Sequence, residues 1–244
     1  MIENDMKFIQ PTWPAPAHIK AYTTTRSSWG THYHPADDAE KNLAYLEDHK
    51  KLKALLELPN DPIWISQTHS TTAITATGVH KNTVADASLT TEKNQVCVVM
   101  TADCLPILVT TTDGSHVAAI HAGWRGLSKG IVENTLSQMS CDKEKLLIWL
   151  GPAIGPSHFE VGEDVYSAFV SQNSQAAKGF QSLSTGKYLA NLYALAKIRL
   201  NQLGVNHIYG GDFCTYTQSD LFFSYRRDQG HVGRMASLIW IAED

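Results

Sequence analysis

Residues 96–126 read VCVVMTADCLPILVTTTDGSHVAAIHAGWRG, and this stretch decides the fold. Its two apolar runs, 96–100 and 117–120, are short and rich in β-branched residues, which is typical of buried strands. Asp113-Gly114 lies between them and is a turn signal, so the sequence predicts a hairpin inside the stretch. We therefore expect two neighbouring strands joined through this hairpin.

Metal-binding side chains follow these strands. Cys104 comes after the first apolar run and His121 directly after the second. A third candidate, His69, follows another short apolar run at 62–65. Proteins hold catalytic zinc with three N or S ligands and leave a fourth position free, whereas structural zinc usually has four protein ligands. The sequence therefore predicts a metal-dependent enzyme site.

The remaining apolar patterns predict helices and strands in mixed order. We expect helices over residues 38–58, 126–140, about 162–173 and about 188–203. Further strands are expected over residues 19–25, 62–65, 146–150 and 208–209, with a final strand within 233–241. The order lacks the regular strand–helix alternation and the G-x-G-x-x-G motif of a dinucleotide-binding fold. We predict the α+β class, as a single compact layered domain over 1–244 with mixed β-sheets flanked by helices.

Composition and charge exclude several classes of protein. The chain has 244 residues, a net charge of -4 and 20 scattered basic residues, so we expect no nucleic-acid partner. No signal peptide is recognisable and no apolar run is long enough for a membrane span, which predicts a cytoplasmic protein without a membrane partner. The cysteines form no C-x-x-C motif and no paired framework, so free thiols are expected.

Other chemically capable residues have simpler interpretations. Cys97 and Cys141 are expected to be inert buried thiols. His32 and His34 form an H-x-H pair in a polar loop, where solvated histidines are the simplest interpretation. The run 226–228, Arg-Arg-Asp, is either a surface ion-pair network or part of a site, and the sequence leaves both interpretations open.

Two arginines stand where an anion would be favoured. Arg26 comes at the end of the predicted strand 19–25. Arg125 lies at the N-terminal turn of the predicted helix 126–140, where free backbone amides attract negative charge. Its guanidinium suits a carboxylate or a phosphate.

Five motifs taken together resemble one family. In chain order they are Gln67-Thr68-His69, TADCLP at 101–106, HAGWRG at 121–126, GPAIGP at 151–156 and FSYRRD at 223–228. They closely resemble the YfiH family, also called the laccase-domain or polyphenol-oxidase-like family. This resemblance implies a compact layered fold similar in outline to a cysteine-hydrolase-like fold. It also implies one zinc ion, with copper as the alternative metal, bound by His69, Cys104 and His121.

The chain departs from the family pattern in two places. Ser27-Ser28-Trp29-Gly30 stands where Gly-Gly-Val-Ser is usual, and residues 44–48 replace a Gly-x-His-x-Gly-Asp segment. Substrate contacts made by the second segment are therefore not carried over to this chain.

The resemblance implies a purine nucleoside phosphorylase acting on adenosine, inosine and methylthioadenosine, with adenosine deaminase activity. His69, Cys104 and His121 would be both metal ligands and catalytic residues, with zinc activating water for deamination and phosphate attacking in phosphorolysis. From the chemistry alone, Arg26 and Arg125 are the candidate phosphate contacts. Asp103 is grouped with these candidate substrate-binding residues, as a possible partner that orients a ligand histidine.

Three alternatives stay open. An amide hydrolase, editing a wrong amino acid out of peptidoglycan precursors, would use the metal to polarise a carbonyl or Cys104 to attack it. Such a hydrolase would ignore phosphate, whereas phosphorolysis requires it. A copper polyphenol oxidase needs several coppers held by clustered histidines and ranks last. A non-enzymatic binding module would be unaffected in the cell by Cys104→Ala.

Overall fold

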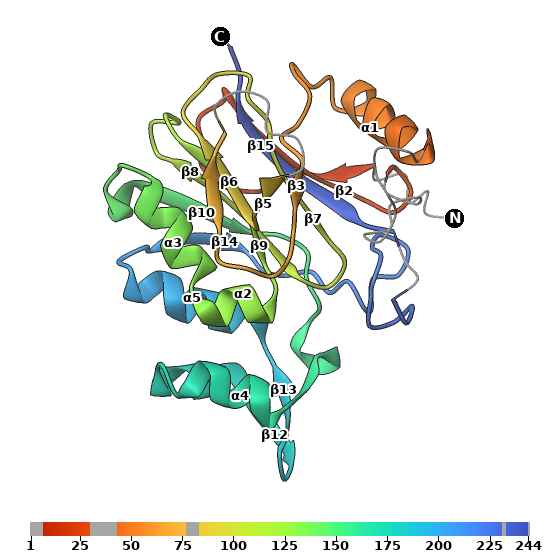
Figure 1. The fold of residues 1–244 in the computed structure, drawn as a ribbon. Coiled ribbons are helices and arrows are strands. Elements are labelled where there is room, and N and C mark those ends of the chain that lie inside the picture. The colour runs from red at the N-terminus through yellow and green to blue at the C-terminus, as the bar shows by residue number, and fades with distance from the viewer. Residues whose placement is uncertain (1–6, 30–42, 77–82, 231–232, 244) are drawn as a thin grey trace.

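Two β-sheets form the centre of the molecule (Figure 1). The computed structural model describes residues 7–29, 43–76, 83–230 and 233–243. The four-stranded sheet has the order β1 (Phe8–Ile9), β2 (Ile19–Thr24), β15 (Met235–Ile241) and β7 (Cys97–Thr101). The six-stranded sheet has the order β14 (His207–Gly210), β10 (Leu146–Leu150), β8 (Leu105–Thr111), β9 (Val117–Ala122), β6 (Ala87–Thr90) and β4 (Ala73–Thr75). Strands β7 and β15 lie against β8 and β9, so the two sheets form adjacent layers.

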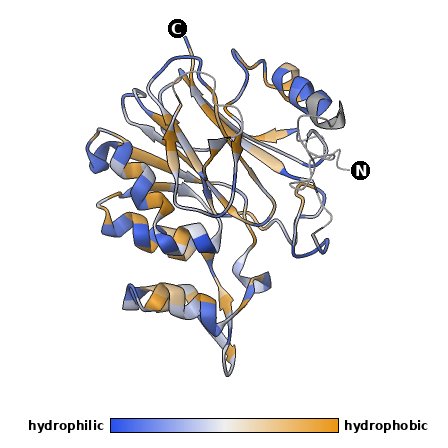
Figure 2. Cartoon of the chain, viewed as in Figure 1, coloured by the Kyte–Doolittle hydropathy of each residue, from blue (hydrophilic) through white to orange (hydrophobic). Residues whose placement is uncertain are grey.

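Helices cover the other face of the six-stranded sheet. The helices are α1 (Leu43–Leu55), α2 (Trp124–Lys129), α3 (Ile131–Gln138), α4 (Glu163–Val170) and α5 (Leu192–Gln202), with short 3-10 turns at 143–145, 156–158 and 174–179. Of these, α1 lies elsewhere, against the four-stranded sheet, where its Leu52 packs in one core with Val98 and Leu238. α3 contacts β9, β6 and β4, and α5 packs beside it in the same core (Figure 1). Buried apolar residues of α2, α3, α4 and α5 belong to one core with β8, β9 and β10, and Figure 2 shows that these helices carry both hydrophobic and hydrophilic residues. Every residue of β8, β9 and β10 is buried, as expected of strands that lie between two layers.

Two small sheets complete the structure. One has the order β11 (Glu160–Gly162), β13 (Lys187–Ala190) and β12 (Phe180–Ser184), and it packs with α4. The other pairs β3 (Ile65–Ser66) with β5 (Thr83–Val84) in parallel. The result is a mixed α/β arrangement of several sheets and helices, as predicted. Among the described residues, no helix is both long and apolar enough to cross a membrane.

Residues 96–126 form the predicted strands, but these strands pair with other partners than expected. The hairpin at Asp113-Gly114 is confirmed: Gly114 donates its N–H to the Thr111 carbonyl at 2.9 Å. However, the hairpin joins β8 to β9, and β7 belongs to the other sheet. The predicted neighbouring strands 96–100 and 117–120 therefore lie in different layers. Pro106 does not prevent β8 from pairing, because β8 continues through it opposite His121.

Two predicted helices are wrong in extent. The helix predicted over 126–140 is divided at Gly130, whose φ of 102° lies in the left-handed region that ends helices. The helix predicted over 188–203 begins only at Leu192, after the Asn191 side chain accepts a hydrogen bond from the Ala194 N–H at 3.0 Å. Residues before it form β13, because β11 and β12 pair with both of its edges. The predicted residues 38–42 of the first helix lie outside the described part of the chain.

Candidate metal centre

The structure brings together the three residues that the sequence predicted as ligands. His69, Cys104 and His121 each offer one ligand atom, and these atoms all lie within 4.8 Å of one another. The Cys104 Sγ lies 3.8 Å from the His69 Nε2. The two imidazole rings are 4.8 Å apart at an interplanar angle of 70°. Among the described residues this is the one group of such side chains close enough to share an ion.

Strand register explains this convergence. His121 pairs with Pro106 across the hairpin, so Cys104, two residues earlier, lies beside the end of β9. His69 reaches the same place from the loop after β3 with a φ of 60°, a left-handed conformation that few residues adopt. A Cβ at Gly123 would lie 2.9 Å from both the Cys104 sulfur and the His69 ring. Glycine is therefore required there if the side chains are to meet.

Asp86 holds two of these residues in place. Its Oδ1 lies 2.7 Å from the His121 Nδ1 and accepts a hydrogen bond from the His69 N–H at 3.0 Å. Its Oδ2 accepts 2.6 Å hydrogen bonds from both the N–H and the hydroxyl of Ser70. With Nδ1 engaged by Asp86, the Nε2 of His121 is the nitrogen left for a metal.

The sequence analysis missed Asp86. The signal available was a single acid inside the otherwise apolar run Val84-Ala85-Asp86-Ala87. A fully buried carboxylate in such a run needs partners. Burial opposes its ionisation, but hydrogen bonds from His121 and Ser70 outweigh burial and lower the pKa of Asp86 to about 2.

Charge within the group favours a thiolate. Burial opposes ionisation of Cys104, yet the adjacent His121 and His69 lower the pKa of this thiol below its usual value. Burial likewise opposes protonation of His121, but the Cys104 thiolate and Asp86 raise the pKa of the imidazole. By contrast, burial raises the pKa of Cys97 to about 12, as expected for an inert core thiol.

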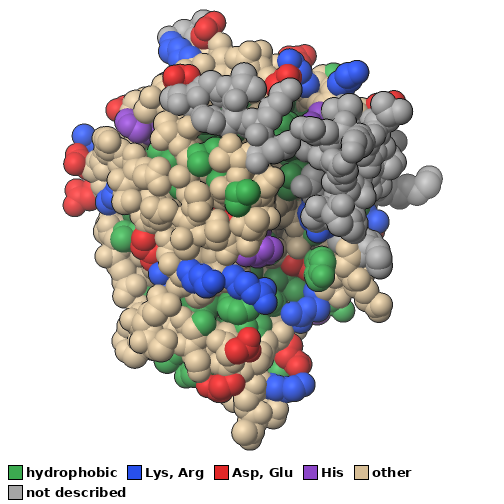
Figure 3. All heavy atoms as spheres, in the orientation of Figure 1, with side chains coloured by type: hydrophobic (Ala, Val, Ile, Leu, Met, Phe, Trp, Pro, Cys, Tyr) green, Lys and Arg blue, Asp and Glu red, His purple; other side chains and the backbone are tan. Residues whose placement is uncertain are grey.

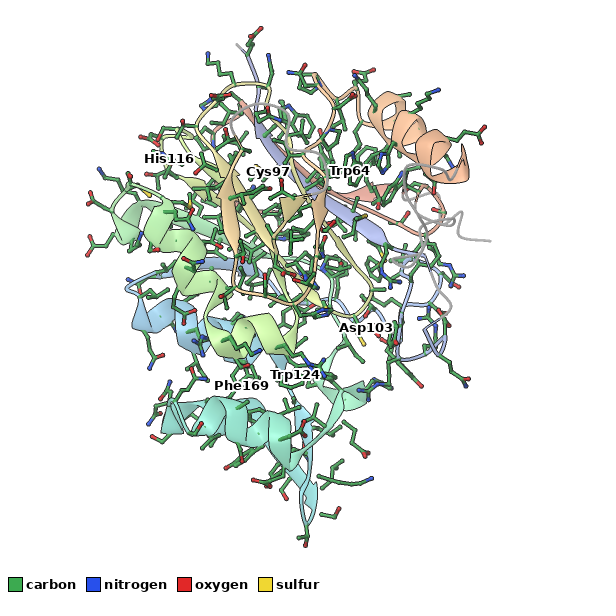
Figure 4. All side chains as sticks on the ribbon, in the orientation of Figure 1. Trp64, Cys97, Asp103, His116, Trp124 and Phe169 are labelled. Atoms are coloured by element: carbon green, nitrogen blue, oxygen red, sulfur yellow. The ribbon has the colours of Figure 1, made fainter. Side chains whose placement is uncertain are left out.

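A cavity of about 730 Å³ opens onto the three residues. Three aromatic side chains line it: Trp124, Phe159 and Tyr225. Figure 4 labels Trp124 and Asp103, which both line the cavity at the lower edge of the sheets in that view. On the surface, a histidine and basic side chains lie side by side in the middle of one face (Figure 3). The cavity therefore combines an apolar wall with positive charge, which suits an aromatic substrate bearing or accompanying an anion.

The predicted arginines differ in position. Arg125 lines the cavity, with its guanidinium 4.4 Å from the Trp124 ring. Arg26 is not among the residues that line it. The Arg26 guanidinium instead donates to the Ser219 carbonyl at 2.7 Å and lies 5.3 Å from the Phe223 ring.

Asp103 also differs from its predicted role. The residue lines the cavity, but its carboxylate accepts hydrogen bonds from Thr215, Ser224 and Arg226. The carboxylate that hydrogen bonds to a ligand histidine is that of Asp86.

The Arg-Arg-Asp run divides into two parts. Arg227 pairs with Asp228 at 2.9 Å and donates to backbone carbonyls, which fixes the loop. Arg226 instead lines the cavity. The run thus contains one ion pair, Arg227 with Asp228, and one arginine, Arg226, that faces the candidate site. The His32–His34 pair lies outside the described residues.

The fold and the site define a mixed α/β protein with a candidate metal centre in a cavity. A family described as multi-copper polyphenol oxidoreductase laccase matches residues 24–242. A Haemophilus influenzae protein named purine nucleoside phosphorylase is 47% identical, over 96% of this chain and 99% of its own length. The Escherichia coli purine nucleoside phosphorylase YfiH is 44% identical over the same shares of the two chains.

Solved structures agree with this likeness. A Neisseria meningitidis protein of the DUF152 family has a TM-score of 0.89 and 40% identity, over 97% of this chain and 100% of its own. A Bacillus licheniformis protein titled hypothetical protein YfiH has a TM-score of 0.82 and 25% identity, over 91% and 92%. The chain belongs to this laccase-domain family, the one that includes the YfiH proteins, as the sequence motifs indicated.

Proposed function

We propose that this protein is a zinc-dependent purine nucleoside phosphorylase that acts on adenosine, inosine and methylthioadenosine. The observation that carries the proposal is the convergence of His69, Cys104 and His121 in a cavity that also holds Arg125 and aromatic side chains. Relatives that match nearly the whole chain are named purine nucleoside phosphorylases. The cavity volume of about 730 Å³ is in the range of small-molecule sites.

The three side chains fit a zinc ion in number and chemistry. One thiolate and two imidazoles are a usual donor set for catalytic zinc, and three protein ligands leave a position for reactant. The second nitrogen of His121 is held by a buried carboxylate, as is common for histidines that bind metals. A bound zinc would supply Lewis-acid chemistry. Thiolate and imidazole also accept copper, so copper is the alternative metal.

The residues of the chain have separate roles in this proposal. Cys104, His69 and His121 hold the metal beside the reacting atoms. The Arg125 guanidinium, stacked on Trp124, binds phosphate and holds it for attack on C1′ of the ribose. The aromatic wall covers the purine and excludes water from it. Adenosine deamination, in which water would attack C6 of the purine and ammonia would leave, would use the same centre.

A second candidate function has its own supporting observation. Cys104 lies beside His121, whose Nδ1 is held by Asp86, and this arrangement resembles the nucleophile, base and orienting acid of cysteine hydrolases. It favours amide hydrolysis with Cys104 as nucleophile. The copper oxidase requires several clustered metal sites, whereas the described residues contain one.

One experiment separates these functions. Purified zinc-loaded protein is incubated with adenosine, with and without phosphate, and the products are separated by chromatography. We expect adenine and ribose 1-phosphate to form only when phosphate is present. Release of adenine that is independent of phosphate, or the absence of any purine product, would contradict it.

A further inference from the structure

Asp103 has a conformation and a set of partners that its predicted role does not explain. Its φ of 83° is rare for a residue with a side chain, and only 8% of its surface is exposed. Its Oδ1 accepts a hydrogen bond from the Thr215 hydroxyl at 2.6 Å. Its Oδ2 accepts from the Ser224 hydroxyl at 3.0 Å and from the Arg226 N–H at 2.7 Å. A buried carboxylate that already accepts this many hydrogen bonds holds the surrounding structure together and is not free to contact substrate.

These hydrogen bonds join the metal centre to a distant loop. Asp103 precedes Cys104 directly, whereas Ser224 and Arg226 come more than 100 residues later, with sequence separations of 121 and 123. The Asp103 carbonyl also accepts from the Ile154 N–H at 3.0 Å. The side chain therefore fixes the backbone of Arg226 relative to the residue that presents the thiolate.

The Arg226 guanidinium is directed by two further contacts. It lies 5.6 Å from the Phe159 ring, and its Nη1 donates to the Glu160 carbonyl at 3.1 Å. The nearby Glu160 carboxylate is paired with Lys187 at 2.9 Å. A guanidinium has five N–H donors, so most remain for a ligand. Because Arg226 lines the same cavity as Cys104 and Arg125, these donors are available to a bound substrate.

We infer that Arg226 binds a phosphate oxygen during the reaction, and that Asp103 is the residue that positions Arg226. This inference rests on the proposed phosphorylase function. Near neutral pH inorganic phosphate is a mixture of the monoanion and the dianion, and Arg125 alone would leave half of the dianion's charge unpaired. A second guanidinium on the same cavity supplies that charge, and planar arginine suits phosphate geometry. Arg226 therefore has the role of second phosphate contact that we predicted from the sequence for Arg26.

The first experiment measures phosphate affinity in zinc-loaded protein. Arg226→Ala should raise the phosphate KM about tenfold or more, as expected for loss of a charge-assisted hydrogen bond, with a smaller change in the adenosine KM. Arg226→Lys keeps the positive charge but loses the planar guanidinium with its paired N–H donors. Its phosphate KM should lie between those of the wild type and Arg226→Ala. Lys145→Ala is the matched control, because this exposed cation pairs with Asp142 outside the cavity. An unchanged phosphate KM in Arg226→Ala would overturn the assignment.

The second experiment tests positioning. Asp103→Asn keeps the shape but weakens the hydrogen bonds to the loop, so the phosphate KM should rise by about threefold or more at wild-type zinc content. The double variant Asp103→Asn with Arg226→Ala should be no worse than Arg226→Ala alone, because both changes remove one interaction. Additive effects, or a loss of zinc without a change in phosphate KM, would overturn the positioning role.

Direct binding separates failure of this inference from failure of the proposed function. Inorganic phosphate is titrated calorimetrically into zinc-loaded wild type and Arg226→Ala in the absence of nucleoside. If wild type turns over no nucleoside but binds phosphate through Arg226, the phosphorylase proposal fails and the anion site stands. If wild type is an active phosphorylase but both proteins bind phosphate equally well, the inference fails and the function stands.

Discussion

The candidate metal centre and the wall of the cavity, which we propose binds substrate, are built differently. The centre depends on the six-stranded sheet: His121 lies within β9, Cys104 next to β8, and the fully buried Asp86 next to β6. The wall includes the exposed side chains of Arg125 and Arg226, which a few contacts hold in place. Changes in the centre should therefore affect metal binding and turnover, and changes in the wall should affect substrate affinity.

The largest effect is expected from Cys104→Ala. Loss of the thiolate leaves two imidazoles, which are too few to hold zinc tightly, so bound zinc and nucleoside turnover should both fall below detection. Metal analysis and the chromatographic assay measure the two effects. Cys141→Ala, at a partly buried thiol outside the cavity, is the matched control and should keep both. Wild-type activity in Cys104→Ala would remove the metal centre from the mechanism.

A smaller effect is expected from Asp86→Asn. The amide has one oxygen, so it can accept from His121 and His69 or from Ser70, but not from both sides, and it lacks the negative charge beside the His121 imidazole, while the volume of the side chain is kept. Zinc affinity, measured by competition with a chelator, should fall by roughly 10- to 100-fold. Asp113→Asn, at an acid in an exposed turn, controls for the loss of charge. Equal zinc affinity in the two variants would show that Asp86 does not support the centre.

Arg125→Ala tests the wall. The phosphate KM should rise about tenfold while zinc content stays at the wild-type value, because the guanidinium contacts substrate rather than metal. Arg26→Ala is the comparison variant. The sequence predicts a phosphate contact for both arginines, whereas the structure places Arg26 outside the cavity lining. A phosphate KM that responds to Arg26→Ala and not to Arg125→Ala would reverse the two assignments.

The smallest change concerns thiol reactivity in metal-free protein. Neighbouring imidazoles lower the pKa of Cys104, whereas burial raises that of Cys141. A thiol is reactive above its pKa, so at pH 7 Cys104 should be the more thiolate-rich of the two and iodoacetamide should alkylate it faster. Peptide mass spectrometry over a pH series measures both rates. Faster alkylation of Cys141 at pH 7 would contradict the charge arrangement of the centre.

The sequence predicted the three central residues because each follows an apolar strand, and strand ends are visible in a local pattern. It could not predict Asp86, since a single acid in an apolar run has no recognisable motif until its partners are known. The contacts of Asp103 lie more than 100 residues away in sequence. The position of Arg26 outside the cavity lining could not be predicted for a similar reason: β2 pairs with β15, and no local pattern gives that sheet order. Short strands such as β13 depend on their neighbours in the same way.

X-ray absorption spectroscopy of the purified protein would identify the atoms bound to a metal at His69, Cys104 and His121. We expect one zinc ion per chain, with a single sulfur at about 2.3 Å and two imidazole nitrogens at about 2.0–2.1 Å. The sulfur contribution should disappear in Cys104→Ala and persist in Cys141→Ala. A metal shell without sulfur in the wild-type protein, or a protein that takes up no metal, would contradict the account.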